Sequence, residues 1–112
     1  MPHVAVVKAR LEKQLVELQA RQTQVAHDLT EPLNPDSSER AVEMEDDASL
    51  ERQAALITRE IASVSRALLR IENGTYGECV RCGASVEPKR LEVRPEAALC
   101  MPCARNEERR DA

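Results

Sequence analysis

The stretch "YGECVRCGASVEPKRLEVRPEAALCMPC", residues 76–103, holds all four cysteines of the chain in two C-x-x-C pairs. These sulfurs could form disulfides, carry out redox chemistry or hold a metal. A redox C-x-x-C of the thioredoxin type needs a strand–helix–strand setting, and no segment here has the pattern of a buried strand followed by a helix. The spacing C-x2-C-x17-C-x2-C lies within the range of four-cysteine zinc sites. It predicts one structural zinc ion, with disulfides or free thiols as the alternatives. The predicted ligands are Cys79, Cys82, Cys100 and Cys103.

The residues beside the cysteines support this interpretation. Gly83 follows Cys82 and lets the first pair turn back, because glycine accepts positive φ. Pro102 suits the first turn of a helix. Four protein ligands leave no open coordination position, so the site is predicted to be structural, and the metal should supply most of the folding free energy of residues 74–112. No Ser/His/Asp set or Cys/His pair stands outside the cysteines, so we do not expect an enzyme.

Composition favours long helices over an ordinary globular core. The chain has 112 residues, 32% of them charged, no Trp or Phe, and Tyr76 as its one aromatic residue. No apolar run reaches the ~20 residues of a membrane span, and Lys8 interrupts the N-terminal stretch before a signal-peptide core can form. We therefore expect a cytoplasmic protein without a membrane segment, and structural disulfides are rare in that compartment.

Apolar residues between positions 50 and 71 alternate at spacings of four and three, which is typical of a coiled-coil seam. They are Leu50, Ala54, Ile57, Ile61, Val64, Leu68 and Ile71. A looser stripe precedes them, at Val4, Val7, Leu11, Leu15, Leu18, Gln22, Val25 and Leu29. Pro32 and Pro35 must interrupt the helix, and a second helix is expected from about Ser37 to Glu72, ended by Asn73 and Gly74. The predicted fold is mainly α: an antiparallel two-helix coiled-coil hairpin over residues 1–73, its tip at about 30–48, then a small four-cysteine zinc module with a C-terminal helix over residues 74–112.

Acidic residues concentrate at the predicted tip, where Arg40 is the single basic residue between positions 31 and 51. They are Glu31, Asp36, Glu39, Glu43, Glu45, Asp46, Asp47 and Glu51. The net charge of −4 and the lack of aromatic residues for base stacking argue against direct nucleic-acid binding, which needs a basic face. An acidic tip suits a basic cleft of a protein partner, or a place where a metal ion is already bound. Asp36 has a second interpretation, as the N-cap of the second helix with Glu39 completing a capping box.

The hairpin with an acidic tip, followed by "YGECVRCG", "RLEVRPEAALC" and "CMPC", resembles the DksA/TraR family of bacterial transcription factors. The similarity is strongest over residues 68–105 and continues along the hairpin to the tip. It implies a regulator that binds RNA polymerase itself: the coiled coil enters the secondary channel, through which nucleotides reach the active site, and the zinc module stays near the rim. In "DSSERA" the resemblance assigns the functional tip to Asp36, Glu39 and Ala41, with Glu39 where the better-studied members have Asp.

The resemblance also raises the question of an alarmone. Members that respond to guanosine tetraphosphate use basic residues at the junction of hairpin and zinc module, and the matching positions include Arg59 and Arg94. Ser63 and Ala104 stand where those members have lysine. For Arg94 the alternative is an ion pair inside the zinc module.

Two functions from different classes follow. The first is a monomeric polymerase-binding regulator, whose tip binds competing promoter-complex states differently and so shifts their populations without making or breaking a bond. The second is a structural or adaptor zinc protein that uses its coiled coil for self-association or for another protein partner.

Overall fold

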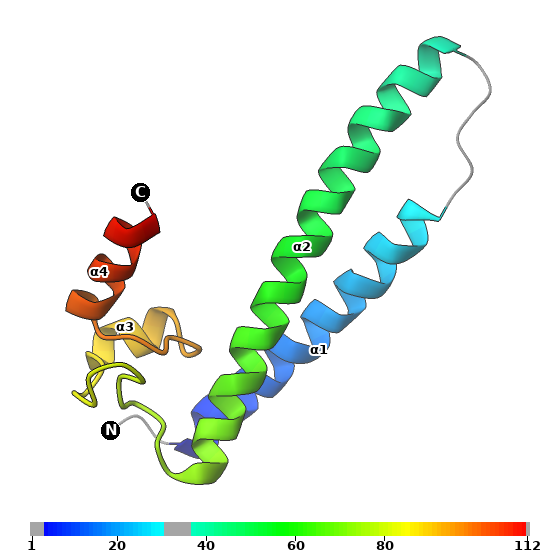
Figure 1. Cartoon of the computed structure of the whole chain (residues 1–112). Helices are drawn as coiled ribbons and strands as arrows, with labels where there is room; N and C mark the ends of the chain where they lie inside the picture. Colours follow the sequence, from blue (N-terminus) through cyan, green and yellow to red (C-terminus); the bar gives the residue numbers. More distant parts are fainter. Residues whose placement is uncertain (1–3, 31–36, 112) are drawn as a thin grey trace. The chain divides into compact units, whose positions relative to one another are not determined.

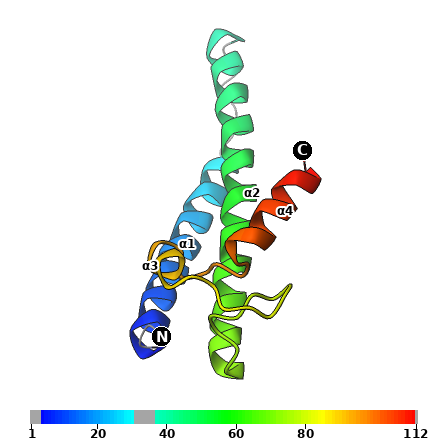
Figure 2. The same ribbon diagram turned by 90° about the vertical axis from the view of Figure 1, so that its left-hand side faces the viewer.

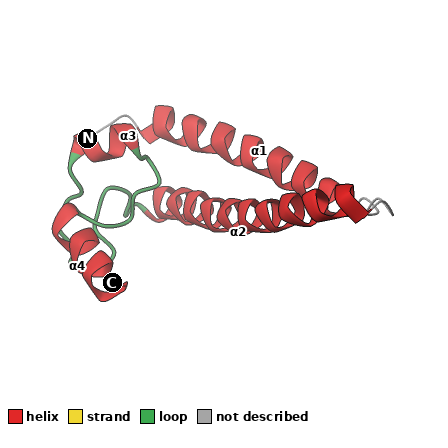
Figure 3. Cartoon of the chain, turned by 90° about the horizontal axis from the view of Figure 1, so that it is seen from above, coloured by secondary structure: helices red, strands yellow, loops and turns green. Residues whose placement is uncertain are grey.

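Four helices make up the regular structure of the chain. The computed structural model describes the backbone of residues 4–30 and 37–111, and the side chains of residues 4–30 and 48–108. The helices are α1 (Val4–Leu29), α2 (Ser37–Asn73), α3 (Pro88–Val93) and α4 (Met101–Asp111) (Figure 1). Within the described ranges the one β-type pairing is an isolated bridge between Glu78 and Ser85, and Figure 3 shows helices joined by loops. The predicted mainly α class is confirmed.

The chain divides into two compact units, residues 1–15 with 63–112 and residues 16–62. Within each unit a part of α1 lies antiparallel beside a part of α2, as Figures 1 and 2 show. The first unit also contains α3, α4 and the loops that carry the cysteines. The predicted division of the chain at residues 73 and 74 stays a prediction.

Each unit has its own buried apolar residues. In the first, Leu11 of α1 and Val64 of α2 are fully buried; in the second, Ile57 of α2 is buried with Leu18 and Val25 of α1. Burying a side chain of this size stabilises the fold by about 1.5–3 kcal/mol. These buried aliphatic side chains stabilise the pairing of α1 with α2, because neither helix contains an aromatic residue.

The predicted seam of α2 is confirmed, since all seven of its residues are buried or half-buried. The stripe of α1 differs at its start: Val4 is 41% exposed and burial begins at Val7, because the first residue of a helix has a neighbouring turn on one side only. Ala67 is fully buried although it was not assigned to the seam. It lies three residues after Val64 and four before Ile71, and hence on the same side of the helix.

The end of α2 confirms the predicted stop. Gly74 has a φ of 76°, and its N–H donates to the Ile71 carbonyl at 3.2 Å while the Thr75 N–H donates to the Arg70 carbonyl at 2.9 Å. This pair of bonds is the Schellman motif, which needs a left-handed residue just beyond the helix. None of the described helices has the length and apolarity to cross a membrane.

Candidate functional site

The first cysteine pair sits on a tight backbone turn. The Cys79 N–H donates to the Ala84 carbonyl at 2.7 Å, and the Gly83 N–H donates back to the Cys79 carbonyl at 2.9 Å. Gly83 has a φ of 78°, as its position after Cys82 predicted. A side chain other than glycine would be strained in this conformation, so the turn that brings the two sulfurs together depends on this residue.

The second pair stands at the start of α4. Cys100 directly precedes the helix and Cys103 lies in its first turn, with Pro102 between them, which confirms the predicted place of Pro102. The N–H of Ala104 donates to the Cys100 carbonyl at 2.9 Å. The free N–H groups of a helix N-terminus favour negative charge, so this position suits sulfurs that bind metal as thiolates.

The two pairs meet in one cluster. The Val80 N–H donates to the Ala98 carbonyl at 2.9 Å and so ties the first turn to the segment that leads into Cys100. The four sulfurs all lie within 4.8 Å of one another, and none of the four cysteines forms a disulfide. Among the residues that the structure describes, this is the one group of His, Cys, Asp or Glu side chains placed closely enough to bind a metal ion.

The geometry fits a tetrahedral ion. Zn–S bonds of about 2.3 Å at tetrahedral angles place neighbouring sulfurs about 3.8 Å apart, and Cys82 Sγ lies 3.7 Å from Cys100 Sγ. A disulfide would need about 2.05 Å. The disulfide alternative is therefore wrong, and the sulfurs have the separation of a four-cysteine zinc site.

The protonation of the cluster also favours a cation. Backbone N–H groups of Cys100 and Cys82 lower the pKa of Cys79 to about 6. The neighbouring Cys100 sulfur, together with burial, raises the pKa of Cys103 to about 12. One sulfur therefore ionises readily, whereas the hydrogen bond with Cys100 and burial hold another in its protonated form. A bound divalent cation favours the thiolate form of its ligands, and all four positions are filled by protein, so the site is structural.

Two arginines make polar contacts next to the cysteine cluster, and neither contact was predicted from the sequence. Arg81, inside the first C-x-x-C, forms an ion pair with Glu107 of α4. Arg90 of α3 donates to the Leu99 carbonyl at 3.1 Å, immediately before Cys100. The short helix α3 was missed as well, although Pro88 at its first position is a helix-start signal.

The other predicted site residues are not brought together in one described place. Asp36 lies outside the described residues, and Glu39 and Ala41 lie on α2 with side chains outside the described set. Arg59 is exposed on α2 in the second unit, whereas Arg94 is exposed after α3 in the first. Among the described side chains Arg94 has no ion-pair partner, so the alternative of an ion pair inside the zinc module finds no support.

A helical hairpin followed by a closed four-cysteine cluster defines a protein with a C4-type zinc finger. Comparison with known families agrees: residues 74–109 match the prokaryotic dksA/traR C4-type zinc finger, and residues 7–71 match the DnaK suppressor protein-like N-terminal domain. The chain belongs to the DksA/TraR family. Its cofactor is accordingly one structural zinc ion.

Relatives and solved structures give the same result. The chain is 36% identical over 81 residues, 70% of its length, to the RNA polymerase-binding transcription factor DksA of Escherichia coli K12, and spans 53% of that protein. The Caulobacter vibrioides protein of the same name is 33% identical over 81 residues, covering 66% of this chain and 57% of the relative. The chain thus spans about half the length of these curated relatives.

Among solved structures, transcription factor DksA2 from Pseudomonas aeruginosa superposes with a TM-score of 0.80 at 27% identity, covering 96% of this chain and 84% of that chain. The solution structure of the DnaK suppressor protein from Agrobacterium tumefaciens superposes with a TM-score of 0.66 at 32% identity, covering 95% of both chains. The fold, a helical hairpin followed in the chain by a zinc finger, is therefore shared with proteins of this family.

Proposed function

We propose that this chain is a transcription regulator that binds bacterial RNA polymerase directly and inserts its acidic tip into the secondary channel. The observation that carries the proposal is the family match over both parts of the chain, residues 7–71 and 74–109, together with relatives named as polymerase-binding transcription factors. The protein acts in the bacterial cytoplasm as a monomer, without binding DNA and without catalysing a reaction.

The charge distribution supports this choice of partner. Eight acidic residues against one basic residue lie between positions 31 and 51, whereas residues 74–112 are balanced, with seven acidic and seven basic residues. A concentrated acidic segment is attracted to a site that holds catalytic Mg²⁺ and basic side chains. The zinc module lacks the basic excess of a DNA-binding module, so it serves as a docking part of the protein.

Asp36, Glu39 and Ala41 carry the regulatory contact in this proposal. The tip binds some promoter-complex states more tightly than others, and the populations shift by that difference in affinity. Glu39 is one methylene longer than the aspartate of better-studied members, which moves its carboxylate by about 1.5 Å, enough to weaken a finely positioned contact. Glu39→Asp is therefore expected to strengthen the effect on transcription.

The response to an alarmone is a second part of the proposal. Arg59 and Arg94 supply two cationic side chains for guanosine tetraphosphate, and both are exposed. Ser63 and Ala104, where responsive members have lysine, remove two of the charges that phosphate recognition uses. We expect a reduced response to this nucleotide compared with the relatives that carry those lysines.

The test combines binding with competition. Zinc-loaded protein is titrated into bacterial RNA polymerase by fluorescence anisotropy, and the DksA of Escherichia coli is then added as competitor. The proposal predicts binding that the competitor displaces. Binding that the competitor leaves intact would place the chain elsewhere on the polymerase. Absence of binding at micromolar concentration, with a dimer in sedimentation, would favour the adaptor alternative.

The tip is tested in the same system by Asp36→Ala/Glu39→Ala. The matched control is Glu12→Ala/Glu17→Ala, which removes two exposed carboxylates of α1. The tip variant should still bind polymerase but lose its effect on a ribosomal-type promoter, and the control should keep both activities. Equal effects of the two variants would mean that total charge matters and the tip residues do not.

A further inference from the structure

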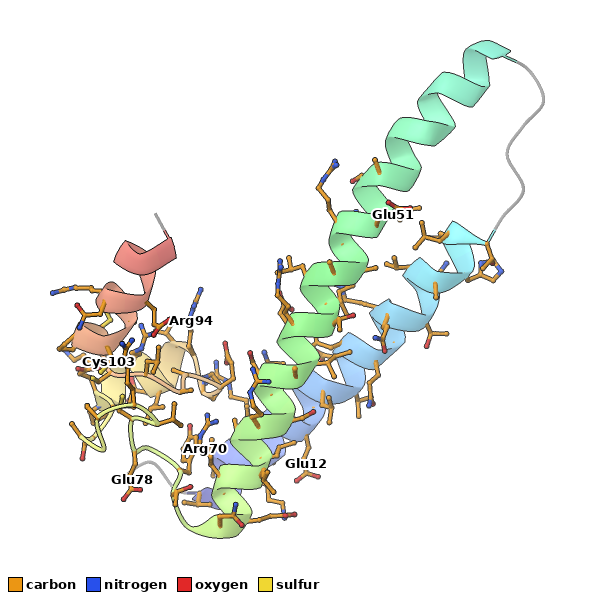
Figure 4. All side chains as sticks on the ribbon, viewed as in Figure 1. Glu12, Glu51, Arg70, Glu78, Arg94 and Cys103 are labelled. Carbon is orange, nitrogen blue, oxygen red and sulfur yellow. The ribbon has the colours of Figure 1, made fainter. Side chains whose placement is uncertain are left out.

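Three hydrogen-bond donors, two on the helices beside the zinc module and one at the start of the module itself, converge on one short segment between the two cysteine pairs. Arg10 of α1 donates to the Glu92 carbonyl at 2.6 Å, and Arg70 of α2 donates to the Glu96 carbonyl at 3.3 Å. The Tyr76 hydroxyl donates to the Pro95 carbonyl at 2.9 Å. All of these residues belong to the first compact unit. In Figure 4 Arg70 lies on the side of α2 that faces the loops of that unit.

We call these three donors the latch, and the helical residues 4–15 and 63–73 the base. Tyr76 is buried and Arg70 is half-buried, whereas Arg10 is exposed. Tyr76 is only 4% exposed, and burial raises its pKa, with the charges of Arg70, Glu96 and Arg10 acting on the same hydroxyl. Burial also lowers the pKa of Arg70. Hydrogen bonds from charged donors to carbonyls are stronger than those from neutral donors, and a buried carbonyl without a donor is costly. The segment 92–96 therefore has one favoured position on the base.

The held segment is connected to both halves of the metal cluster. It continues into Ala98, whose carbonyl accepts the Val80 N–H from the first cysteine pair. It then reaches Leu99, whose carbonyl accepts a bond from Arg90, and Cys100. Fixing the carbonyls of residues 92–96 therefore fixes the whole cluster on the base, through contacts that involve no metal ligand.

We propose that Arg10 and Arg70 are positioning residues that hold the zinc module in one orientation on the base, with Tyr76 fixing the segment 92–96 inside the module, and that this orientation sets the affinity for polymerase. The first part follows from the contacts of the first unit, and the second rests on the proposed function. A module that kept its zinc and its fold but lost the latch would sample several orientations. If it occupied the binding orientation about a tenth of the time, the measured Kd for polymerase would rise about tenfold.

The experiment uses the full zinc-loaded chain and residual dipolar couplings of backbone N–H groups. In the wild type, residues 63–73 and 76–100 should fit a single alignment tensor. Arg10→Gln/Arg70→Gln should lose that single tensor, with weaker alignment of the module, while the zinc content stays at one per chain. The control is Arg66→Gln, one turn before Arg70 on α2 and exposed, which should keep the single tensor.

If the double variant loses zinc or helix content, the single variants Arg10→Gln and Arg70→Gln take its place in the same comparison. A single tensor in every zinc-loaded latch variant would overturn the proposal. If a variant no longer fits a single alignment tensor and its affinity for polymerase is unchanged, the second part of the proposal is wrong. If the wild type itself does not bind polymerase, the proposed function fails, and the dipolar couplings still decide whether the latch positions the module.

Discussion

Zinc removal should unfold the zinc module and leave much of the hairpin helical. Within residues 74–108 the large buried side chains other than the cysteines are Tyr76, Val86 and Leu91. Three such side chains form only a small core for a segment of this length. The metal therefore supplies most of the folding free energy of the module, since a structural zinc site contributes roughly 10 kcal/mol.

The size of the expected change follows from the helix lengths. Helices α3 and α4 have 6 and 11 residues, against 26 and 37 in α1 and α2. Loss of α3 and α4 alone would remove about a fifth of the helical signal at 222 nm. Tyr76 would pass from its buried site to solvent, and because the chain has no Trp, its emission reports this step without interference.

The assay is far-UV circular dichroism and tyrosine fluorescence during titration with a strong chelator, followed by addition of Zn²⁺. We expect a drop of about a fifth that Zn²⁺ reverses and Mg²⁺ does not, because a cluster of thiolates prefers the softer ion. Chelation that abolishes the whole helical signal would show that the hairpin depends on the metal. Chelation without any change would show that the apolar contacts suffice, and either result would refute the reasoning.

Three further changes test the packing, the helix end and the latch. Leu11→Ala should lower the free energy of unfolding by about 3 kcal/mol because it opens a cavity at a fully buried site. The control is Val6→Ala: the Val6 side chain is 67% exposed, and its loss should change the free energy of unfolding by less than about 0.5 kcal/mol. Equal effects of the two substitutions in urea unfolding would contradict the assigned core. Gly74→Ala should cost about 1 kcal/mol from the positive φ alone, since its Cβ would meet nothing within 4 Å, and Gly74→Asn should cost less. Burial raises the pKa of Tyr76 above 10.0, so absorbance titration of this single tyrosine should have its midpoint above that of the unfolded chain. Stability should be intact below pH 10 and fall as the pH rises through the folded pKa, because the unfolded chain releases the proton more easily; an unshifted midpoint would mean that the hydroxyl is solvated.

The parts of the fold that the sequence could predict are those with a strong local signal. The alternating seam from Leu50 to Ile71 predicted the buried face of α2, because apolar spacing maps directly onto one side of a helix. Asn73 and Gly74 predicted the end of α2, and the cysteine spacing predicted the four-sulfur cluster, since two C-x-x-C pairs at this separation are typical of four-cysteine zinc sites. The cluster then excluded disulfides by its sulfur–sulfur separation.

The parts that it could not predict depend on contacts between distant segments. Arg10 and Glu92 are 82 positions apart, and nothing local distinguishes this arginine from other exposed residues of α1. The same holds for Arg81 with Glu107, which are 26 positions apart. Ala67 gives only a weak hydrophobic signal because its side chain is a single methyl group. Such residues become visible only when the packing of the unit is known.

Crosslinking from the tip shows whether this part of the chain enters the secondary channel of RNA polymerase. A photoreactive amino acid is placed at Ala41, and at exposed Val16 of α1 as a control outside the tip, in zinc-loaded protein mixed with RNA polymerase. The account predicts that position 41 crosslinks to polymerase residues that line the secondary channel, and that excess Escherichia coli DksA suppresses this product. Crosslinks from position 41 only to a second copy of the chain, or to polymerase surfaces outside the channel, would contradict it.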